Sequence, residues 1–302
     1  MEEIGELATF LGNNISLNYQ DQSITIDQND YISKILSKFA TTSKRPKKTP
    51  GEAGIHLRKN QSKASEQTIN LYQKEIGSLL YTSLKTRPDI AYPVAYCSRY
   101  MSNPDQSHIS ELKKIWQYLQ YRPNLGLHYD CTGNDLYIKG YSDADWSGDI
   151  DGRKSTTGYI FSLSGDLATN NIVSWNSMLQ KSVALSTCEA EYMAMKEAIR
   201  EAIYLANLFN YLNDRLGLGY TPSKPTILVD NKAAIKLAEN PEFHKRTKHI
   251  DIQYHYIRDQ VKQKRVDVQY VPTKLQLADF LTKNVRREIF EDLKNLANLY
   301  EI

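Results

Sequence analysis

The stretch LYIKGYSDADWSGDIDGRKSTTG (136–158) constrains the fold most, because it has the pattern of a strand that ends in acids. Its first residues alternate between apolar and polar side chains, and the run closes on Asp143 and Asp145. A rigid strand with a carboxylate at its tip is a common support for a metal site, since the tip is open to solvent and substrate. The stretch therefore predicts a sheet with an acidic site at one end.

The residues that follow extend this strand into a sheet. Further strands are predicted at 159–163, 172–175, 225–230 and 265–271, with a long helix over 185–212. The run PTILVD (225–230) is almost continuously apolar, which indicates a strand buried on both faces and paired in parallel with the first. The order βββ-α-β-α-(α)-β-α predicts a mixed sheet with helices packed on it.

Three more acids could join Asp143 at one site. Glu191 lies near the start of the long helix, Asp230 ends the buried strand, and Asp279 opens a late helix that begins LADFLTK. Each has an ordinary explanation by itself, because acids also favour turns and the first turns of helices. Together they match what phosphodiester hydrolysis by two Mg²⁺ or Mn²⁺ ions requires, namely hard oxygen ligands around ions roughly 3.5–4 Å apart. No histidine or cysteine is placed to favour zinc.

Two neighbouring acids compete with the predicted ligands. A two-residue offset on a strand keeps the same face, so Asp145 is a rival of Asp143. The same offset on a helix turns the side chain by about 200°, so Glu189 should point away from Glu191.

The first half shows no catalytic constellation. Antiparallel strands are predicted within 6–26, and four helices are predicted at 31–39, 66–84, 88–101 and 105–121. The loop 41–64 has seven basic residues and one acidic residue, and its charge fits a solvated linker as well as a contact to phosphates. His56 and His108 are interpreted as surface histidines. The predicted domains are 1–135 and 136–302.

Composition sets broad limits. A chain of 302 residues has room for two domains, and a net charge of +3 is weak support for a polyanion partner. Three cysteines without metal-type spacing favour reduced thiols in an intracellular protein. No apolar run approaches the roughly 18 residues of a membrane span, and the acidic start MEEIGELATFLG is unlike a signal peptide.

Several longer motifs carry a family resemblance. YSDADWSGDIDGRKSTTGYIF, STCEAEYMAM, LVDNKAAIKLAENPEFHKRTKHIDI and YVPTKLQLADFLTK resemble the ribonuclease H domain of copia-type LTR retrotransposon polyproteins. FLGNNIS and YQKEIGSLLYTSLKTRPDIAYPVAYCSRYMSNP resemble the part of the copia-type reverse transcriptase that follows its palm, the thumb and connection. The resemblance implies a ribonuclease H-like α/β fold, with a mixed five-stranded sheet and flanking helices, preceded by a smaller α+β reverse-transcriptase remnant.

The resemblance also implies a function. Asp143, Glu191, Asp230 and Asp279 match the family's catalytic and metal-binding acids, which use two Mg²⁺ or Mn²⁺ ions to cut the RNA strand of RNA–DNA hybrids. The expected partners are such a hybrid and other Pol or capsid pieces, in cytoplasmic particles or the nucleus and without a membrane. Nucleic-acid contacts are expected from five basic residues, Lys154, Lys245, Arg246, Lys248 and His249. Within the motif KHID (248–251), a structural role at a helix start remains as open as a catalytic one.

The chain departs from the family pattern in two places. No Tyr-x-Asp-Asp motif of a polymerase palm occurs, so the chain is not expected to polymerise DNA by itself. Met1 stands where the palm should have ended, as expected for a fragment or for the reading frame of a broken element. The segment SWNSMLQ (174–180) lacks the basic residues usual there. These departures keep open an alternative, a catalytically silent remnant with at most residual nucleic-acid binding.

Overall fold

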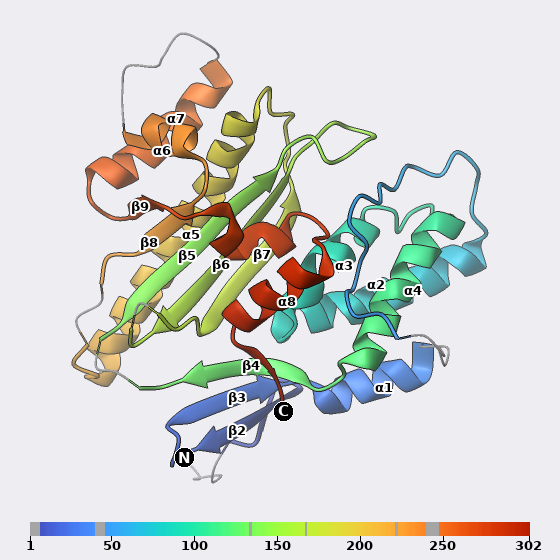
Figure 1. Ribbon diagram of the computed structural model, residues 1–302, viewed down its shortest axis with the longest axis horizontal. Helices are drawn as coiled ribbons and strands as arrows, with labels where there is room; N and C mark the ends of the chain where they lie inside the picture. Colours follow the sequence, from blue (N-terminus) through green and yellow to red (C-terminus); the bar gives the residue numbers. More distant parts are fainter. Residues whose placement is uncertain (1–6, 40–45, 133–134, 167, 221–222, 240–247) are drawn as a thin grey trace. The chain divides into compact units, whose positions relative to one another are not determined.

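The chain forms two compact units in a computed structural model (Figure 1). The structure describes residues 7–39, 46–132, 135–166, 168–220, 223–239 and 248–302. The first unit combines Met1–Cys131 with Lys283–Ile302, and the second is Thr132–Thr282. Among the described helices, none has the length and apolar composition needed to cross a membrane.

The second unit is built on a five-stranded mixed sheet. Its strands are β5 (Tyr137–Asp145), β6 (Thr156–Ser164), β7 (Ile172–Leu179), β8 (Thr226–Val229) and β9 (Asp267–Tyr270). The spatial order is β7-β6-β5-β8-β9. The first three strands are antiparallel, whereas β8 pairs in parallel with both β5 and β9. The predicted mixed sheet, with the apolar run 225–230 in parallel beside the first strand, is confirmed.

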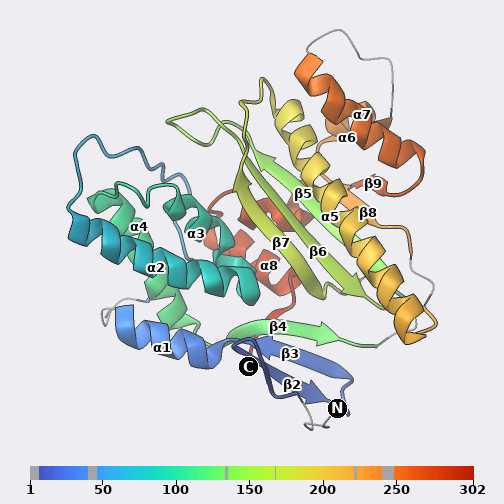
Figure 2. The ribbon, with the colours of Figure 1, turned by 180° about the vertical axis from the view of Figure 1, so that it is seen from behind.

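The long helix α5 (Thr187–Leu216) packs on one face of this sheet (Figure 2). Its side chains at four-residue intervals are small and fully buried, which lets the helix axis approach the strands closely. These residues are Ala190, Ala194, Ala198 and Ala202. Beneath the helix, Gly140 of β5 leaves room for Phe161, because a Cβ there would lie 2.2 Å from the ring.

Short helices complete the second unit. They are α6 (Lys232–Glu239), α7 (Lys248–Lys262) and two 3₁₀ helices, η2 (Thr273–Leu275) and η3 (Leu277–Leu281). The side chain of Asn231 caps α6, accepting hydrogen bonds from the backbone N–H groups of Ala233 and Ala234. The helix predicted at LADFLTK is the 3₁₀ helix η3, whose backbone bonds span three residues, as from the Asp279 N–H to the Gln276 carbonyl.

The first unit has its own antiparallel sheet, in the order β1-β2-β3-β4-β10. Its strands are β1 (Thr9–Phe10), β2 (Asn13–Asn18), β3 (Ser23–Asp27), β4 (Leu125–Asp130) and β10 (Leu299–Glu301). Its helices are α1 (Asn29–Phe39), α2 (Glu66–Lys85), η1 (Pro88–Ile90), α3 (Ala91–Ser98), α4 (Gln106–Tyr121) and α8 (Arg287–Leu296). The antiparallel strands and four helical segments predicted in this half are confirmed.

The last twenty residues pack with the first half of the chain. They belong to the first compact unit, whereas the predicted domain 136–302 includes them, and that domain boundary stays a prediction. Strand β10 pairs with β4, the Phe290 ring packs edge-on against Tyr118 at 5.6 Å, and Arg122 forms an ion pair with Glu291. These contacts join residues more than 150 positions apart, which local sequence patterns do not show.

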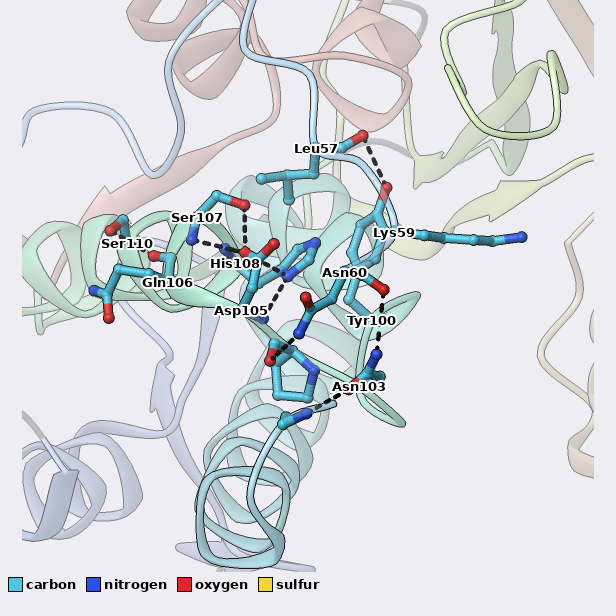
Figure 3. Close-up of polar contacts among 12 residues, drawn as sticks. Leu57, Lys59, Asn60, Tyr100, Asn103, Asp105, Gln106, Ser107, His108 and Ser110 are labelled. Atoms are coloured by element: carbon cyan, nitrogen blue, oxygen red, sulfur yellow. Dashed lines mark hydrogen bonds and ion pairs between the residues drawn. The ribbon is translucent and has the colours of Figure 1, made fainter. Parts of the chain in front are cut away.

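The basic loop is anchored in its described part (Figure 3). The Asn60 side chain donates to the Pro104 carbonyl, and the Asn103 side-chain amide donates to the carbonyls of Asn60 and Ser62. The Tyr100 hydroxyl donates to the Leu57 carbonyl at 3.1 Å. These bonds hold the loop against the end of α3 and the start of α4. Residues 40–45, which include part of the predicted loop, lie outside the described residues.

His108 is buried, so its interpretation as a surface histidine was wrong. Its Nδ1 accepts a hydrogen bond from the Asp105 N–H, while the Asp105 carboxylate accepts from the His108 N–H. The ring also stacks on Tyr100, with centroids 4.1 Å apart (Figure 3). A histidine three residues after an acidic N-cap can close this reciprocal capping box, and the stacking then covers the ring.

Candidate metal centre

Asp143 lies near the C-terminal end of β5, where the sequence predicted it. The strand holds it directly opposite Gly158 of β6, and only 4% of its surface is exposed. Its Oδ2 accepts a hydrogen bond from the Thr282 hydroxyl at 2.5 Å. The carboxylate is thus held by a rigid strand on one side and by the segment after η3 on the other.

Glu191 comes from the second turn of α5. The helix begins after Ser186, whose hydroxyl accepts from the Glu189 N–H, a standard N-cap bond. Gln180 ties this end of the helix to the sheet, donating from its side-chain amide to the Thr157 hydroxyl and to the Ala190 carbonyl. The Glu191 side chain, 7% exposed, is therefore fixed in position through its neighbour Ala190.

Asp230 follows β8 directly and completes a group of three carboxylates. One carboxylate oxygen from each of Asp143, Glu191 and Asp230 lies within 4.8 Å of the others. Asp230 is half-buried and the other two acids are buried. Parallel pairing of β5 and β8 brings their C-terminal ends to the same edge of the sheet, which explains why these two strand-end acids meet.

Three carboxylates this close repel one another unless a cation joins them. Two full charges at 4.8 Å cost about 3 kcal/mol at an effective dielectric constant near 20. The field of the site reaches Cys188, where burial raises the pKa of the thiol and the negative charges of Glu191 and Glu189 raise it further. The oxygen-only donor set and its excess negative charge fit a hard divalent cation such as Mg²⁺ or Mn²⁺.

The fourth predicted ligand, Asp279, lies outside this group of three, so its role as a ligand stays a prediction. It is on η3, with 8% of its surface exposed. The segment still touches the group through Thr282, whose backbone N–H donates to the Asp279 carbonyl and whose hydroxyl donates to Asp143. The backbone of η3 is thus linked to Asp143 through Thr282.

Neither competing acid belongs to the group. The carboxylate of Asp145 lies over the turn after β5, where a Cβ on Gly148 would be 2.1 Å from its Oδ2. Glu189 accepts a hydrogen bond from the Leu185 N–H, so it faces the helix start, as the helical offset predicted. Asp145 is the last residue of β5, and its carboxylate turns toward Gly148 of the following turn.

The predicted nucleic-acid contacts are only partly placed. Lys154 is half-buried in the turn between β5 and β6, where its carbonyl accepts from the Asp149 N–H. Lys248 and His249 are the first two residues of α7, so the motif KHID does stand at a helix start. Lys245 and Arg246 lie outside the described residues.

Sequence reasoning missed the residues that hold the acids in place. Gln180 and Thr282 are buried and polar, and so is Gln276, whose side-chain amide donates to the Ser142 carbonyl of β5. The sequence offered one signal for such residues, a polar side chain within an apolar run, such as Thr282 in the motif LADFLTK. Their partners lie up to 139 positions away, so spacing alone could not identify the contacts.

The second unit has the ribonuclease H-like fold predicted above. Its sheet has three antiparallel strands followed by two parallel ones, and α5 lies across it. A likeness in fold to a solved structure extends beyond this unit. A foamy viral protease-reverse transcriptase, solved in complex with an RNA/DNA hybrid, covers 92% of this chain and 30% of that chain, with a TM-score of 0.50 and 16% identity.

Sequence relatives then identify the family. No family model matches. The retrovirus-related Pol polyprotein from transposon TNT 1-94 of Nicotiana tabacum is 37% identical over 308 residues, covering 99% of this chain and 22% of the relative. The retrovirus-related Pol polyprotein from transposon RE1 of Arabidopsis thaliana is 37% identical over 288 residues, covering 95% of this chain and 19% of the relative. The chain spans about a fifth of these relatives' length. It belongs to the retrovirus-related Pol polyproteins of transposons.

Proposed function

We propose that the second unit cuts the RNA strand of RNA–DNA hybrids by hydrolysis that depends on divalent cations. The observation that carries this proposal is the group of Asp143, Glu191 and Asp230 at one edge of a ribonuclease H-like sheet. The family adds support, because its members are Pol polyproteins of transposons. The foamy viral relative in fold was solved with an RNA/DNA hybrid, the substrate class proposed here.

The three acids would hold Mg²⁺ or Mn²⁺ ions, and Asp279 of η3 is proposed as a fourth ligand. When bound, such ions activate a water molecule and stabilise the leaving 3′-oxygen. The chain's own contribution is rigidity. Strand β5, the capped start of α5 and the end of β8 each fix one carboxylate, so little reorganisation is needed as charge develops.

Substrate contacts are proposed for the basic residues predicted from the sequence. Lys154 lies after β5, in a turn held by the Asp149 carboxylate, which accepts a hydrogen bond from the Gly152 N–H. A cation on a short, internally bonded turn loses little entropy when it contacts a phosphate. Contact with 2′-hydroxyl groups would distinguish the RNA strand from DNA.

The first unit is proposed to be the thumb and connection part of a reverse transcriptase. Relatives cover this half as well as the second, and its helices and sheet form a compact unit of their own. Its anchored basic loop presents Arg58, Lys59 and Lys63 on the surface. A loop bonded at Leu57, Asn60 and Ser62 holds the neighbouring cations in a constant arrangement, which suits a phosphate backbone better than a free linker does.

The test is cleavage of an end-labelled RNA–DNA hybrid by the full chain, with Mg²⁺ or Mn²⁺ and with EDTA. An Asp230→Asn variant provides the matched control, and a DNA duplex tests the choice of substrate. The expected result is cation-dependent cutting of the RNA strand only, lost in the variant. A chain that is folded by circular dichroism and leaves the hybrid intact would overturn the proposal and favour the silent remnant.

A further inference from the structure

The Thr282 hydroxyl makes a short contact with an acid of the candidate centre. It donates to Asp143 Oδ2 at 2.5 Å, while the Asp279 carbonyl lies 3.0 Å from the same hydroxyl. A hydroxyl has one hydrogen, and a charged oxygen at the shorter distance is the stronger acceptor. The hydrogen therefore belongs to the bond with Asp143.

Three contacts hold Thr282 where it can make this bond. Its backbone N–H donates to the Asp279 carbonyl and closes the last turn of η3. The Gln276 side chain joins the start of the same helix to the Ser142 carbonyl of β5. Gly158 of β6 leaves room for the segment, because a Cβ there would lie 2.7 Å from Thr282 Cγ2. The side chain is fully buried, so water does not compete for the hydroxyl.

We propose that Thr282 is a positioning residue that orients the Asp143 carboxylate for cation binding. This inference rests on the proposed function. One lone pair of Oδ2 accepts the hydrogen bond from the hydroxyl, which sets the rotation of the carboxylate relative to the other two acids. Through its backbone N–H, Thr282 also joins Asp143 to the turn that carries Asp279.

If the Thr282 hydroxyl had only a structural role, a different experimental outcome would be expected. If Thr282 only satisfies a buried polar group, removing its hydroxyl lowers stability but leaves cation affinity unchanged in the folded protein. If it orients Asp143, affinity for the cation falls. Partners of this kind typically change metal affinity by about ten- to a hundredfold.

The experiment compares variants of the full chain by isothermal titration with Mn²⁺. Thr282→Val removes the hydroxyl at constant shape, and Thr282→Ser retains it. Thr82→Val is the matched control, because Thr82 is equally buried and its hydroxyl donates to a helix carbonyl of the first unit. Thr282→Val is expected to weaken Mn²⁺ affinity by about ten- to a hundredfold. Thr282→Ser and Thr82→Val should remain close to the unsubstituted chain.

Cleavage of the hybrid gives a second readout. In Thr282→Val the Mn²⁺ concentration for half-maximal cutting should rise by the same factor, with the rate recovering at high Mn²⁺. If this variant does not fold, Thr282→Ala against Thr282→Ser carries the test, since the two differ by one oxygen atom. Equal Mn²⁺ affinity with and without the hydroxyl overturns the inference alone. Failure of the unsubstituted chain to bind Mn²⁺ overturns the proposed function as well.

Discussion

The two units bury carboxylates in opposite ways. In the first unit, the fully buried Arg87 guanidinium binds the Asp89 carboxylate at 2.8 Å, and the Tyr118 hydroxyl donates to the same carboxylate at 2.6 Å. In the second unit, the carboxylates of Asp143, Glu191 and Asp230 face one another.

The pKa values of Arg87 and Tyr118 reflect the balance of charge in the first cluster. Burial acts to lower the pKa of the Arg87 guanidinium, but Asp89 and Tyr118 together outweigh burial and the net pKa is raised. Burial raises the pKa of the Tyr118 hydroxyl well above its ordinary range, and Asp89 adds to the rise. The first cluster is balanced within the chain, which is typical of a structural element. The second gathers like charges, which is typical of a site that binds a cation.

Breaking the balanced cluster should have the largest effect on stability. Arg87→Met leaves the Asp89 carboxylate buried without its guanidinium, so the first unit should lose about 3–5 kcal/mol. Hydrogen exchange of the α4 amides measures this loss. The double variant Arg87→Met/Asp89→Leu should recover part of it, because the uncompensated charge is then gone. Unchanged exchange in the single variant would contradict the comparison.

Adding a cation should stabilise only the second unit. Mn²⁺ at a hundred times its dissociation constant should contribute about 2.7 kcal/mol to the folded state. The measurement is hydrogen exchange of the α5 amides with Mn²⁺ and with EDTA. Protection of α4 in the first unit serves as the internal control, and an Asp143→Asn variant should show little change on α5. Equal protection of both helices would argue against a site at the acids.

Displacing η3 should weaken the second unit by about 1–3 kcal/mol through overpacking. In Gly158→Ala the new Cβ would meet Thr282 Cγ2 at 2.7 Å and Leu281 Cβ at 2.9 Å, so η3 must shift and the bond to Asp143 must lengthen. Thermal unfolding and Mn²⁺ titration should both show the defect. Gly77→Ala is the control. A Cβ added there would meet nothing within 4 Å outside its own helix backbone, and alanine favours the interior of α2.

Neutralising one acid of the group should raise stability in EDTA, whereas neutralising Arg87 should lower it. In EDTA, Glu191→Gln removes repulsion within the group and should stabilise the second unit by about 1–2 kcal/mol at low salt. The same variant should lose at least about a hundredfold in hybrid cleavage, since cation ligation supplies several kcal/mol to the transition state. Chemical denaturation with α5 exchange reports the stability. A loss of stability in EDTA would show that the three charges are already balanced within the chain.

The smallest predicted effect concerns the basic loop of the first unit. Arg58→Gln/Lys63→Gln should reduce the slope of log affinity for a hybrid against log salt concentration by about 1–2. Fluorescence anisotropy at several salt concentrations measures the slope, with Lys74→Gln on α2 as the control. An unchanged slope would identify the loop as a solvated linker.

Local patterns in the chain were sufficient to predict most elements and three of the acids. Alternation over 136–145 and the apolar run 225–230 predicted β5 and β8, and their parallel pairing brings Asp143 and Asp230 together. The capped start of α5 placed Glu191 near the same edge. These predictions succeed because the periods of strands and helices are properties of the backbone, which nearby residues reveal.

Tertiary structure alone decided how those elements close around the site. The 3₁₀ helix η3, which carries Asp279, is held on the sheet by Gln276 and Thr282. The last twenty residues join the first unit through β10, and His108 is covered by Tyr100. Each of these outcomes depends on packing or on hydrogen bonds that a period in the sequence does not encode. Side-chain direction and long-range pairing are settled only when distant segments compete for the same space.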